Sequence, residues 1–595
     1  MMDERRSDHT NSDSDAAAPP GPRPDRDVAA PNSWSTSNQA DASAASEISG
    51  MGSSGDDDGD GDGDGESIGI AIGAPPAGTV DPDSGIGLQA SEAAVTTARP
   101  PGRGLVGWWQ RFAEPSGPPI RSGRLAGKSL PAAILIVALP ILLEQLANVV
   151  VGLVDVTLAG HLPEDIVRPA LDGVGAGSYL RWFMGITTSA VGIGGMALIS
   201  RATGADRPEE ARRALGQTAM LSLVFGVAIG VILWVMVEAV VRLVSLEGQA
   251  AEFCREYVRI IAVGLPPATF MFATMMCLRG AGETSKPFYV VLVVNAVNIV
   301  VSWILCGADL ELSLFGRPIE QPWDFNLAVA GIAWGTVAGY CVGAALMALL
   351  LIRGVRDLKL EAQGLRPDLE MQGRIVKIGI PSFFEGTGMW MGHLIASMAL
   401  IGVISEVMEA RGEESSGLMG AHIVAIQWES VSFMPGFALG IAAGSIAGQF
   451  LGAGNPQMAR RAILACAATA MTFMTLAGVV FIFAGEWLTR IITEDDEQIL
   501  EIAPDLLMIC GFVQTFFALG LVLRQALRSL GDTRTTLVLT LCATYGIRVP
   551  LTWLFGYFMG FGIHGLWIGA CTELALTGLI FLARFLQGKW MHLKV

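Results

Sequence analysis

Three polar side chains interrupt the apolar run of residues 131–159, namely Glu144, Asn148 and Asp155. An ionisable side chain inside a membrane costs several kcal/mol unless it is paired or hydrated, so each intramembrane carboxylate is a candidate for function. Eleven residues turn a helix by about 1,100°, which is within about 20° of three full turns. Glu144 and Asp155 should therefore share one helix face, about 16 Å apart along the axis, with Asn148 between them. A carboxylate desolvated at such a place is suited to load and release a proton.

An internal repeat relates further polar residues to one another. Residues 192–214 read GIGGMALISRATGADRPEEARRA and residues 440–462 read GIAAGSIAGQFLGAGNPQMARRA, with glycine, proline and arginine positions shared at one offset of 248 residues. At that offset Arg181 corresponds to Glu429. A repeat sets the architecture of a chain, and duplicated hydrophobic halves are common among secondary transporters.

Twelve apolar segments follow one another from about residue 130, each long enough for the roughly 20 residues that cross a bilayer. They predict an all-α integral membrane protein with two six-helix lobes, related by pseudo-twofold symmetry about the membrane normal. The predicted lobes are residues 128–360 and 361–595, preceded by an acidic cytoplasmic tail of residues 1–127 that we expect to be disordered. The predicted spans are 131–159, 173–199, 214–238, 257–278, 287–306, 327–352, 375–404, 418–447, 463–485, 502–524, 536–559 and 562–586.

The charges predict the orientation of these spans. Residues 1–99 carry 19 Asp/Glu against 5 Arg, so the acidic net charge describes the tail and not the membrane part. Segments before the first span, after the last and after each even-numbered span hold 27 Lys/Arg, against 6 in the opposite loops. By the positive-inside rule both termini should be cytoplasmic.

The repeated element resembles the multidrug and toxic compound extrusion (MATE) transporters, and within them the DinF-like branch. Further resemblances are Pro140 and Pro381 near the start of each half, Leu-Arg-Gly-Ala-Gly-Glu-Thr at 278–284, Leu-Arg-Ser-Leu-Gly-Asp-Thr at 527–533, and Arg548-x-Pro550. The match covers roughly residues 128–590. The resemblance implies two six-helix lobes around a central cleft, alternating access, and efflux driven by inward flow of H+ or Na+.

The same resemblance implies an ion-coupling site in the first lobe. Asp155 stands where the family has its coupling carboxylate, and the matching neutral positions are Asn298, Ser302 and Thr336. Ser302 replaces a second carboxylate of the family pattern, which favours H+ over Na+ without excluding Na+.

The second half is not an electrostatic copy of the first. Glu385 repeats Glu144, but the position that matches Asp155 is Ala396. We therefore expect ion coupling in the first lobe, and we expect Glu144 and Glu385 either to line the cleft or to satisfy backbone groups freed at the preceding prolines. Arg181 and Glu429 are predicted to form a state-dependent gate, the alternative being a static pair or separate partners, and Gln427 is a further candidate for the cleft.

Three functions fit these features to different degrees. The favoured one is a secondary active antiporter that exports amphipathic or cationic compounds in exchange for H+ or Na+. The alternative is a lipid-linked saccharide flippase, whose cavity should carry several basic residues for a phosphate; Arg181 is the clear candidate. An intramembrane enzyme is disfavoured because residues 128–595 lack His-Glu-x-x-His, Gly-x-Ser-x-Gly and Walker-type motifs. We expect a monomer in the plasma (inner) membrane whose partners are the lipid bilayer and a small-molecule substrate, with no nucleic acid, metal or cofactor beyond the coupling ion.

Overall fold

The computed structural model describes residues 117–593, apart from 122, 164–165, 244–246, 309–312, 315–316, 319–322, 324, 413–414, 416 and 494–495. The side chains of 172, 175–184, 186–188, 240, 243, 313–314 and 317–318 lie outside the described part as well. The predicted tail is outside it up to residue 116. Within the described part of the predicted tail, Ile120 and Leu125 are buried, so the packed structure includes residues ahead of 128.

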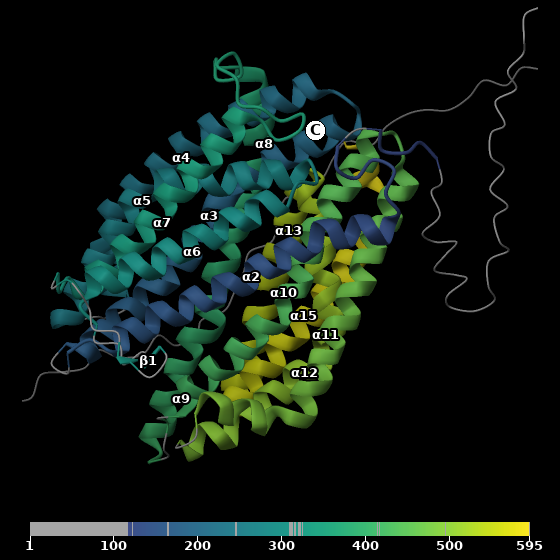
Figure 1. The fold of residues 1–595 in the computed structure, drawn as a ribbon. Helices are drawn as coiled ribbons and strands as arrows, with labels where there is room; N and C mark the ends of the chain where they lie inside the picture. The colour runs from purple at the N-terminus through teal and green to yellow at the C-terminus, as the bar shows by residue number, and fades with distance from the viewer. Residues whose placement is uncertain are drawn as a thin grey trace, which may run out of the picture. The chain divides into compact units, whose positions relative to one another are not determined.

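The described chain is almost entirely helical, with one two-stranded hairpin, β1 (Ser313–Leu314) and β2 (Arg317–Pro318) (Figure 1). Among the described residues, eleven helical segments are long and apolar enough to cross a membrane. The 38-residue helix α3, part of whose side chains lie outside the described residues, is the further long helix of the predicted twelve. The helices are α2 Leu130–Gly160, α3 Val167–Gly204, α4 Pro208–Leu243, α5 Gly248–Gly280, α6 Ser285–Cys306, α7 Ala328–Arg353, α8 Leu369–His393, α9 Ala399–Ala410, α10 Gly417–Gly452, α11 Pro456–Ile492, α12 Glu497–Ser529, α13 Thr533–Ala543, α14 Val549–Trp553 and α15 Gly562–Leu586.

Local sequence explains where several helices begin. Asp368, Asn455 and Asp496 each accept a hydrogen bond from the backbone N–H three residues later, which satisfies one of the donors left free at a helix N-terminus. Pro456 and Pro208 occupy first helical positions, where the missing N–H costs nothing.

Three π-helical segments, η1 (Leu394–Met398), η2 (Thr544–Arg548) and η3 (Leu554–Phe558), interrupt helices of the second half. A π-bulge inserts a residue into the regular ladder and is frequent at functional sites. The segment η1 joins α8 to α9 and contains Ala396, the counterpart of Asp155, whereas α2 is a continuous α-helix around Asp155. The two first spans of the repeat therefore differ in backbone as well as in charge.

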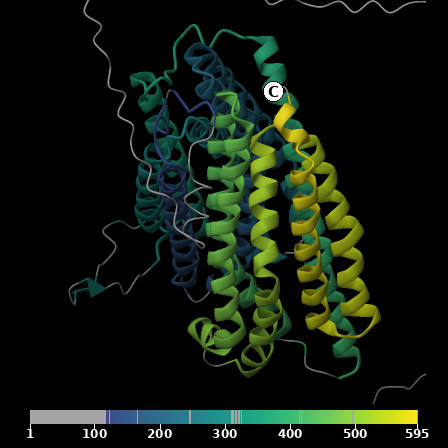
Figure 2. The same ribbon diagram turned by 90° about the vertical axis from the view of Figure 1, so that its right-hand side faces the viewer.

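Helix packing confirms two six-helix lobes. In the first lobe α3 packs on α5, α5 on α4 and α7, and α6 on α7 and α2; in the second lobe α10 packs on α12, α12 on α11 and α15, and α13 on α8. These pairs are equivalent under the repeat, and Figure 2 shows the second-lobe helices, green to yellow, running side by side.

The lobes meet where the repeated element of α3 and α10 crosses. A Cβ on Gly448 would overlap Ser200, its own counterpart in the repeat. A Cβ on Gly204 would overlap the carbonyl oxygen of Gln449, and one on Gly452 would overlap that of Arg201. These contacts are reciprocal, so the pseudo-twofold axis passes between α3 and α10 near Gly204 and Gly452. We call this end of the molecule, where the C-terminal ends of α3 and α10 meet, the joined end.

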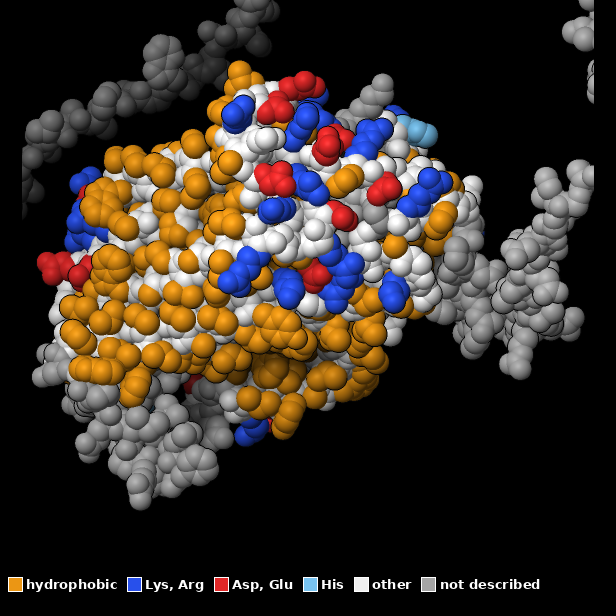
Figure 3. Space-filling model, turned by 45° about the horizontal axis from the view of Figure 1, so that its top comes forward, with side chains coloured by type: hydrophobic (Ala, Val, Ile, Leu, Met, Phe, Trp, Pro, Cys, Tyr) orange, Lys and Arg blue, Asp and Glu red, His pale blue; other side chains and the backbone are white. Residues whose placement is uncertain are grey.

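Charged side chains gather on the face that Figure 3 brings forward, while hydrophobic side chains cover the flank of the helices. Large apolar side chains such as Val235, Phe483 and Phe512 are more than two-thirds exposed. In water this would be a large uncovered patch, and in lipid it is the expected surface of a membrane protein.

The glycine crossing generates a prediction. We expect Gly204→Ala to lower the stability of the purified protein by about 1–3 kcal/mol, because the added Cβ has backbone and not a flexible side chain in front of it. Gly373→Ala is the matched control, since Gly373 lies in α8 with open space around it. Thermal unfolding in detergent measures both; equal midpoints for Gly204→Ala and the wild type would contradict the crossing.

Candidate functional site

The predicted ion-coupling residues are buried in the first lobe. The exposed fraction is 2% for Asp155, 4% for Asn298, 0% for Ser302 and 4% for Thr336. Asn298 Nδ2 donates to Thr336 Oγ1 at 2.9 Å, and the hydroxyls of Ser302 and Thr336 both donate to the carbonyl of Ile332, at 3.2 and 3.3 Å. The three neutral residues therefore form one connected polar group between α6 and α7.

Asp155 approaches the same region from α2. Leu158, one turn beyond Asp155, belongs to one apolar cluster with Cys306, Ile332 and Ala333. Asp155 lies five residues before the end of α2, and Ser302 lies four residues before the end of α6. Since α2 packs on α6, Asp155 and Ser302 occupy similar positions near the C-terminal ends of two neighbouring helices.

This group offers oxygen atoms to a small cation. The Oδ1 atom of Asn298 is buried and has no hydrogen-bond partner among the described residues. One carboxylate with an amide oxygen and two hydroxyls is a donor set that takes a hard cation, and the carboxylate alone takes a proton. No group of three or more His, Cys, Asp or Glu side chains of the kind that binds transition metals occurs in the described part of the chain.

Glu144 has a partner of its own, away from this group. Arg279 Nη2 donates to both carboxylate oxygens of Glu144, at 2.5 and 2.6 Å, and both side chains are buried. The interpretation that Glu144 satisfies backbone groups freed at Pro140 thus gives way to a buried ion pair with the last turn of α5. Asn148, between Glu144 and Asp155 in sequence, has an exposed side chain.

Glu385 is held differently in the second lobe. Its carboxylate accepts hydrogen bonds from Thr540 at 3.0 Å and from Thr536 at 3.4 Å. The counterpart of Arg279 is Arg528, which donates to Gln525 Oε1. The repeat conserves the residue types of the pair, but the ion pair is closed in the first lobe alone.

The predicted gate between Arg181 and Glu429 stays a prediction, because the side chain of Arg181 lies outside the described residues. Glu429 is half-buried on α10, in a region where Arg548 and Glu573 form an ion pair at 3.7 Å. Gln427 is exposed.

The joined end holds hydrogen bonds that the sequence did not indicate. Gln449 Nε2 donates to the carbonyl of Gly280 at 3.0 Å, and Ser445 Oγ donates to that of Arg279. From the other lobe Arg201 Nη2 donates to the carbonyl of Leu530 at 3.1 Å. Carbonyls at a helix C-terminus lack intrahelical partners and carry partial negative charge, which suits amide and guanidinium donors. Each lobe thus caps the C-terminus of a helix of the other lobe, and we call this arrangement cross-capping.

The C-terminus of the chain adds to this end. Arg201 Nη1 donates to the carbonyl of Leu593 at 2.5 Å. The segment is anchored by Trp590, which is buried and stacks on Phe585 with ring centroids 5.3 Å apart. One arginine therefore joins α3 to both α12 and the C-terminal segment.

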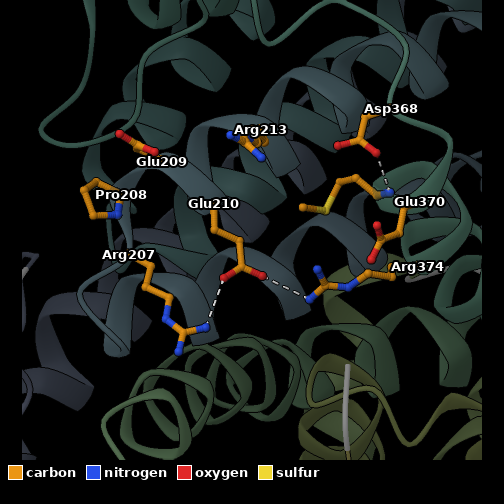
Figure 4. A pocket seen from close by; sticks show the side chains of 9 residues that line it. Arg207, Pro208, Glu209, Glu210, Arg213, Asp368, Glu370 and Arg374 are labelled. Atoms are coloured by element: carbon orange, nitrogen blue, oxygen red, sulfur yellow. Dashed lines mark hydrogen bonds and ion pairs between the residues drawn. The ribbon is translucent and has the colours of Figure 1, made fainter.

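A cavity of about 570 Å³ opens beside the joined end, between the first turns of α4 and α8. Glu210 bridges Arg207 at 3.6 Å and Arg374 at 3.1 Å across it (Figure 4). Its described lining residues include none of the predicted ion-coupling residues, so it is a polar seam between the lobes and not the coupling site.

Comparisons with known proteins agree with this architecture. A family model described as MatE matches residues 140–304 and 394–554. A probable multidrug resistance protein NorM of Thermotoga maritima is 26% identical over 457 residues, which are 76% of this chain and 91% of that protein. The multidrug resistance protein PmpM of Pseudomonas aeruginosa is 25% identical, over 75% of this chain and 88% of that protein. A solved outward-facing structure of a multidrug resistance MATE family transporter of the MOP superfamily has a TM-score of 0.67 at 18% identity, over 78% of this chain and 97% of that one.

The buried pair generates the prediction of this section. Arg279→Met leaves Glu144 as an unpaired buried charge, and we expect a loss of roughly 3–5 kcal/mol of stability. The double variant Glu144→Gln/Arg279→Met should be more stable than Arg279→Met alone, because it removes both charges. Thermal unfolding of the single and double variants measures the difference.

The exposed pair Arg490–Glu486, at 2.8 Å, is the control. Its removal should change stability by about 0.5 kcal/mol or less. If the stability loss of Glu144→Gln/Arg279→Met equals the sum of the losses of Glu144→Gln and Arg279→Met, the two side chains are not coupled.

Proposed function

The chain belongs to the MatE family and is a membrane transporter, and from that premise we propose that it is a secondary active antiporter. It exports amphipathic compounds, cationic ones among them, in exchange for H+ or Na+. The observation that carries this proposal is the buried carboxylate of Asp155 on a helix that packs against those carrying Asn298, Ser302 and Thr336, in one lobe of a symmetric scaffold. The multidrug resistance relatives support the substrate class.

The positive-inside rule supports a cytoplasmic position for the joined end. This end carries Arg201, Arg207 and Arg374 and the arginines at the start of α4 and α11. With that orientation the cross-capped lobes close the cytoplasmic side of a plasma-membrane transporter, and both termini lie in the cytoplasm.

Alternating access then requires that the cross-capping bonds break. Each such bond contributes about 0.5–1.5 kcal/mol, so the bonds from Arg201, Gln449 and Ser445 together amount to a few kcal/mol. A ligand shifts a two-state equilibrium by its differential affinity for the two states, and about 5.5 kcal/mol suffices for a nearly complete switch. The differential affinity of the coupling ion and the substrate for the two states is what must supply this free energy.

H+ is favoured over Na+ because Asp155 is the single carboxylate of the group. A proton needs one carboxylate, whereas a metal ion gains from each additional negative ligand. Asn298, Ser302 and Thr336 supply neutral oxygens, which orient the carboxylate in the H+ case and coordinate the ion in the Na+ case.

Flipping of a lipid-linked saccharide is the second candidate. Two arginines of the second lobe, Arg524 and Arg528, favour it, because a flippase cavity needs cationic groups for a phosphate. The MatE match and the multidrug resistance relatives favour efflux.

The proposal predicts the behaviour of Asp155→Asn in liposomes. We expect dye transport driven by an imposed H+ gradient to fall by about tenfold or more, because asparagine cannot carry the proton. A separately imposed Na+ gradient identifies the ion. Glu501→Gln, which removes an exposed carboxylate, should transport like the wild type.

Dye binding to purified Asp155→Asn shows whether the variant is folded. A variant that binds dye and transports it under either gradient as well as the wild type would overturn the coupling role of Asp155.

A further inference from the structure

Arg524 and Arg528 lie one turn apart on α12, in the interior of the second lobe. Arg524 Nη1 contacts the sulfur of Met389 on α8 at 3.0 Å, and Arg528 Nη2 donates to Gln525 Oε1. The Nε atom of Arg528 is buried without a hydrogen-bond partner in the described structure. A guanidinium has five N–H donors, so most donors of this pair are unused.

Neither arginine makes an ion pair with any carboxylate of the described residues. Glu385 and Arg524 both lie near enough to Arg528 for their charges to act on it. The oxygens of Glu385, however, accept from Thr540 and Thr536. The group formed by Arg524, Arg528 and Glu385 therefore carries two positive charges and one negative charge, a net charge of +1.

The first lobe shows that the fold does not require this excess charge. There Arg279 and Glu144 close on each other, and the position of Arg524 is occupied by Met275, which is fully buried in an apolar cluster. The repeat thus keeps one arginine and one glutamate in both lobes and adds a second arginine to one of them.

Both Arg524 and Arg528 lie in the last two turns of α12, near the joined end. A partly buried arginine without a carboxylate partner is costly at the end of a membrane span as well, and side chains of this kind are retained at ligand pathways. The tip of Arg524 reaches Met389, so its side chain joins α12 to α8. Arg524 and Met389 are half-buried, which leaves the pair reachable by a ligand. A planar guanidinium fork fits a carboxylate or phosphate with two parallel hydrogen bonds.

We propose that Arg524 and Arg528 form a subsite that binds the anionic head group, a carboxylate or phosphate, of an amphipathic ligand. This inference rests on the proposed transport of amphipathic compounds and extends the substrate class to anions and zwitterions. The ion-coupling carboxylate and the anion subsite then lie in different lobes, so a substrate anion and the coupling cation do not compete for one place.

Binding of three probes with the same tail tests the subsite: octyl phosphate, octanoate and octyltrimethylammonium. They are titrated by calorimetry into the full chain in nanodiscs of phosphatidylcholine. Arg524→Met, which copies Met275 of the first lobe, should weaken binding of both anions by roughly tenfold or more. Arg524→Met should leave the affinity for octyltrimethylammonium within about twofold of the wild-type value. Arg524→Lys should recover part of the anion affinity, because lysine restores the positive charge without the planar fork.

Arg490→Met is the control for loss of an exposed arginine and should bind all three probes like the wild type. A second set of nanodiscs with added phosphatidylglycerol identifies the source of the head group. If an anionic lipid fills the site, added phosphatidylglycerol will weaken octyl phosphate binding to the wild type and leave binding to Arg524→Met unchanged. If the ligand is a soluble amphiphile, added phosphatidylglycerol will change the octyl phosphate affinity of neither protein.

Equal anion affinity of Arg524→Met and the wild type would overturn the subsite, and so would an equal loss for octyltrimethylammonium. Because this is equilibrium binding, it is independent of ion coupling. A failed Asp155→Asn transport test would overturn the antiport mechanism and leave the anion result standing.

Discussion

The cross-capping of helix C-termini is the interaction on which the rest of the structure depends. Gln449 and Arg201 are equivalent in the repeat, and each donates to a carbonyl at the C-terminal end of a helix in the opposite lobe. A helix C-terminus presents unpaired carbonyls with partial negative charge, so each lobe completes the hydrogen bonding of the other. The glycines at 204 and 452 allow the backbones to approach closely enough for this exchange.

The two lobes share one helix framework but carry different charged side chains. The Glu144–Arg279 pair is tied to the joined end, because the Arg279 carbonyl accepts from Ser445 of the other lobe. Its counterpart, Glu385 with Arg528, is open and is accompanied by the extra Arg524. The first lobe has Asp155 on a regular helix and the second has Ala396 in a π-helical segment. Each lobe therefore offers a different chemistry on the same helix framework.

Much of this fold could be predicted, because the lengths of the apolar segments and the internal repeat can be read directly from the linear sequence. The spans, the two lobes and the equivalence of residues 248 apart all follow from them. The repeated glycines were visible as a pattern, yet their contact with backbone across the lobes was not, since it depends on how the lobes dock. The partner of Glu144 cannot be predicted for the same reason: Arg279 stands in the motif at 278–284, but 135 residues separate the two side chains.

The candidate site could be predicted in part. Burial of Asp155, Asn298, Ser302 and Thr336 agrees with their predicted role, which remains a prediction. The sequence does not predict a role for Arg524 and Arg528, because arginines near a span end are usually assigned to the interface. Only the contact of Arg524 with Met389 shows that its side chain joins α12 to α8.

Electron–electron distance measurement across the joined end tests the central claim most directly. Spin labels at Lys286 and Arg460, both exposed, would be introduced after replacing the exposed cysteines Cys341 and Cys542. If cross-capping holds the lobes together, Arg201→Met/Gln449→Leu will move a large part of the distance distribution to longer values than in the otherwise unchanged protein. An unchanged distribution in that double variant would contradict the account.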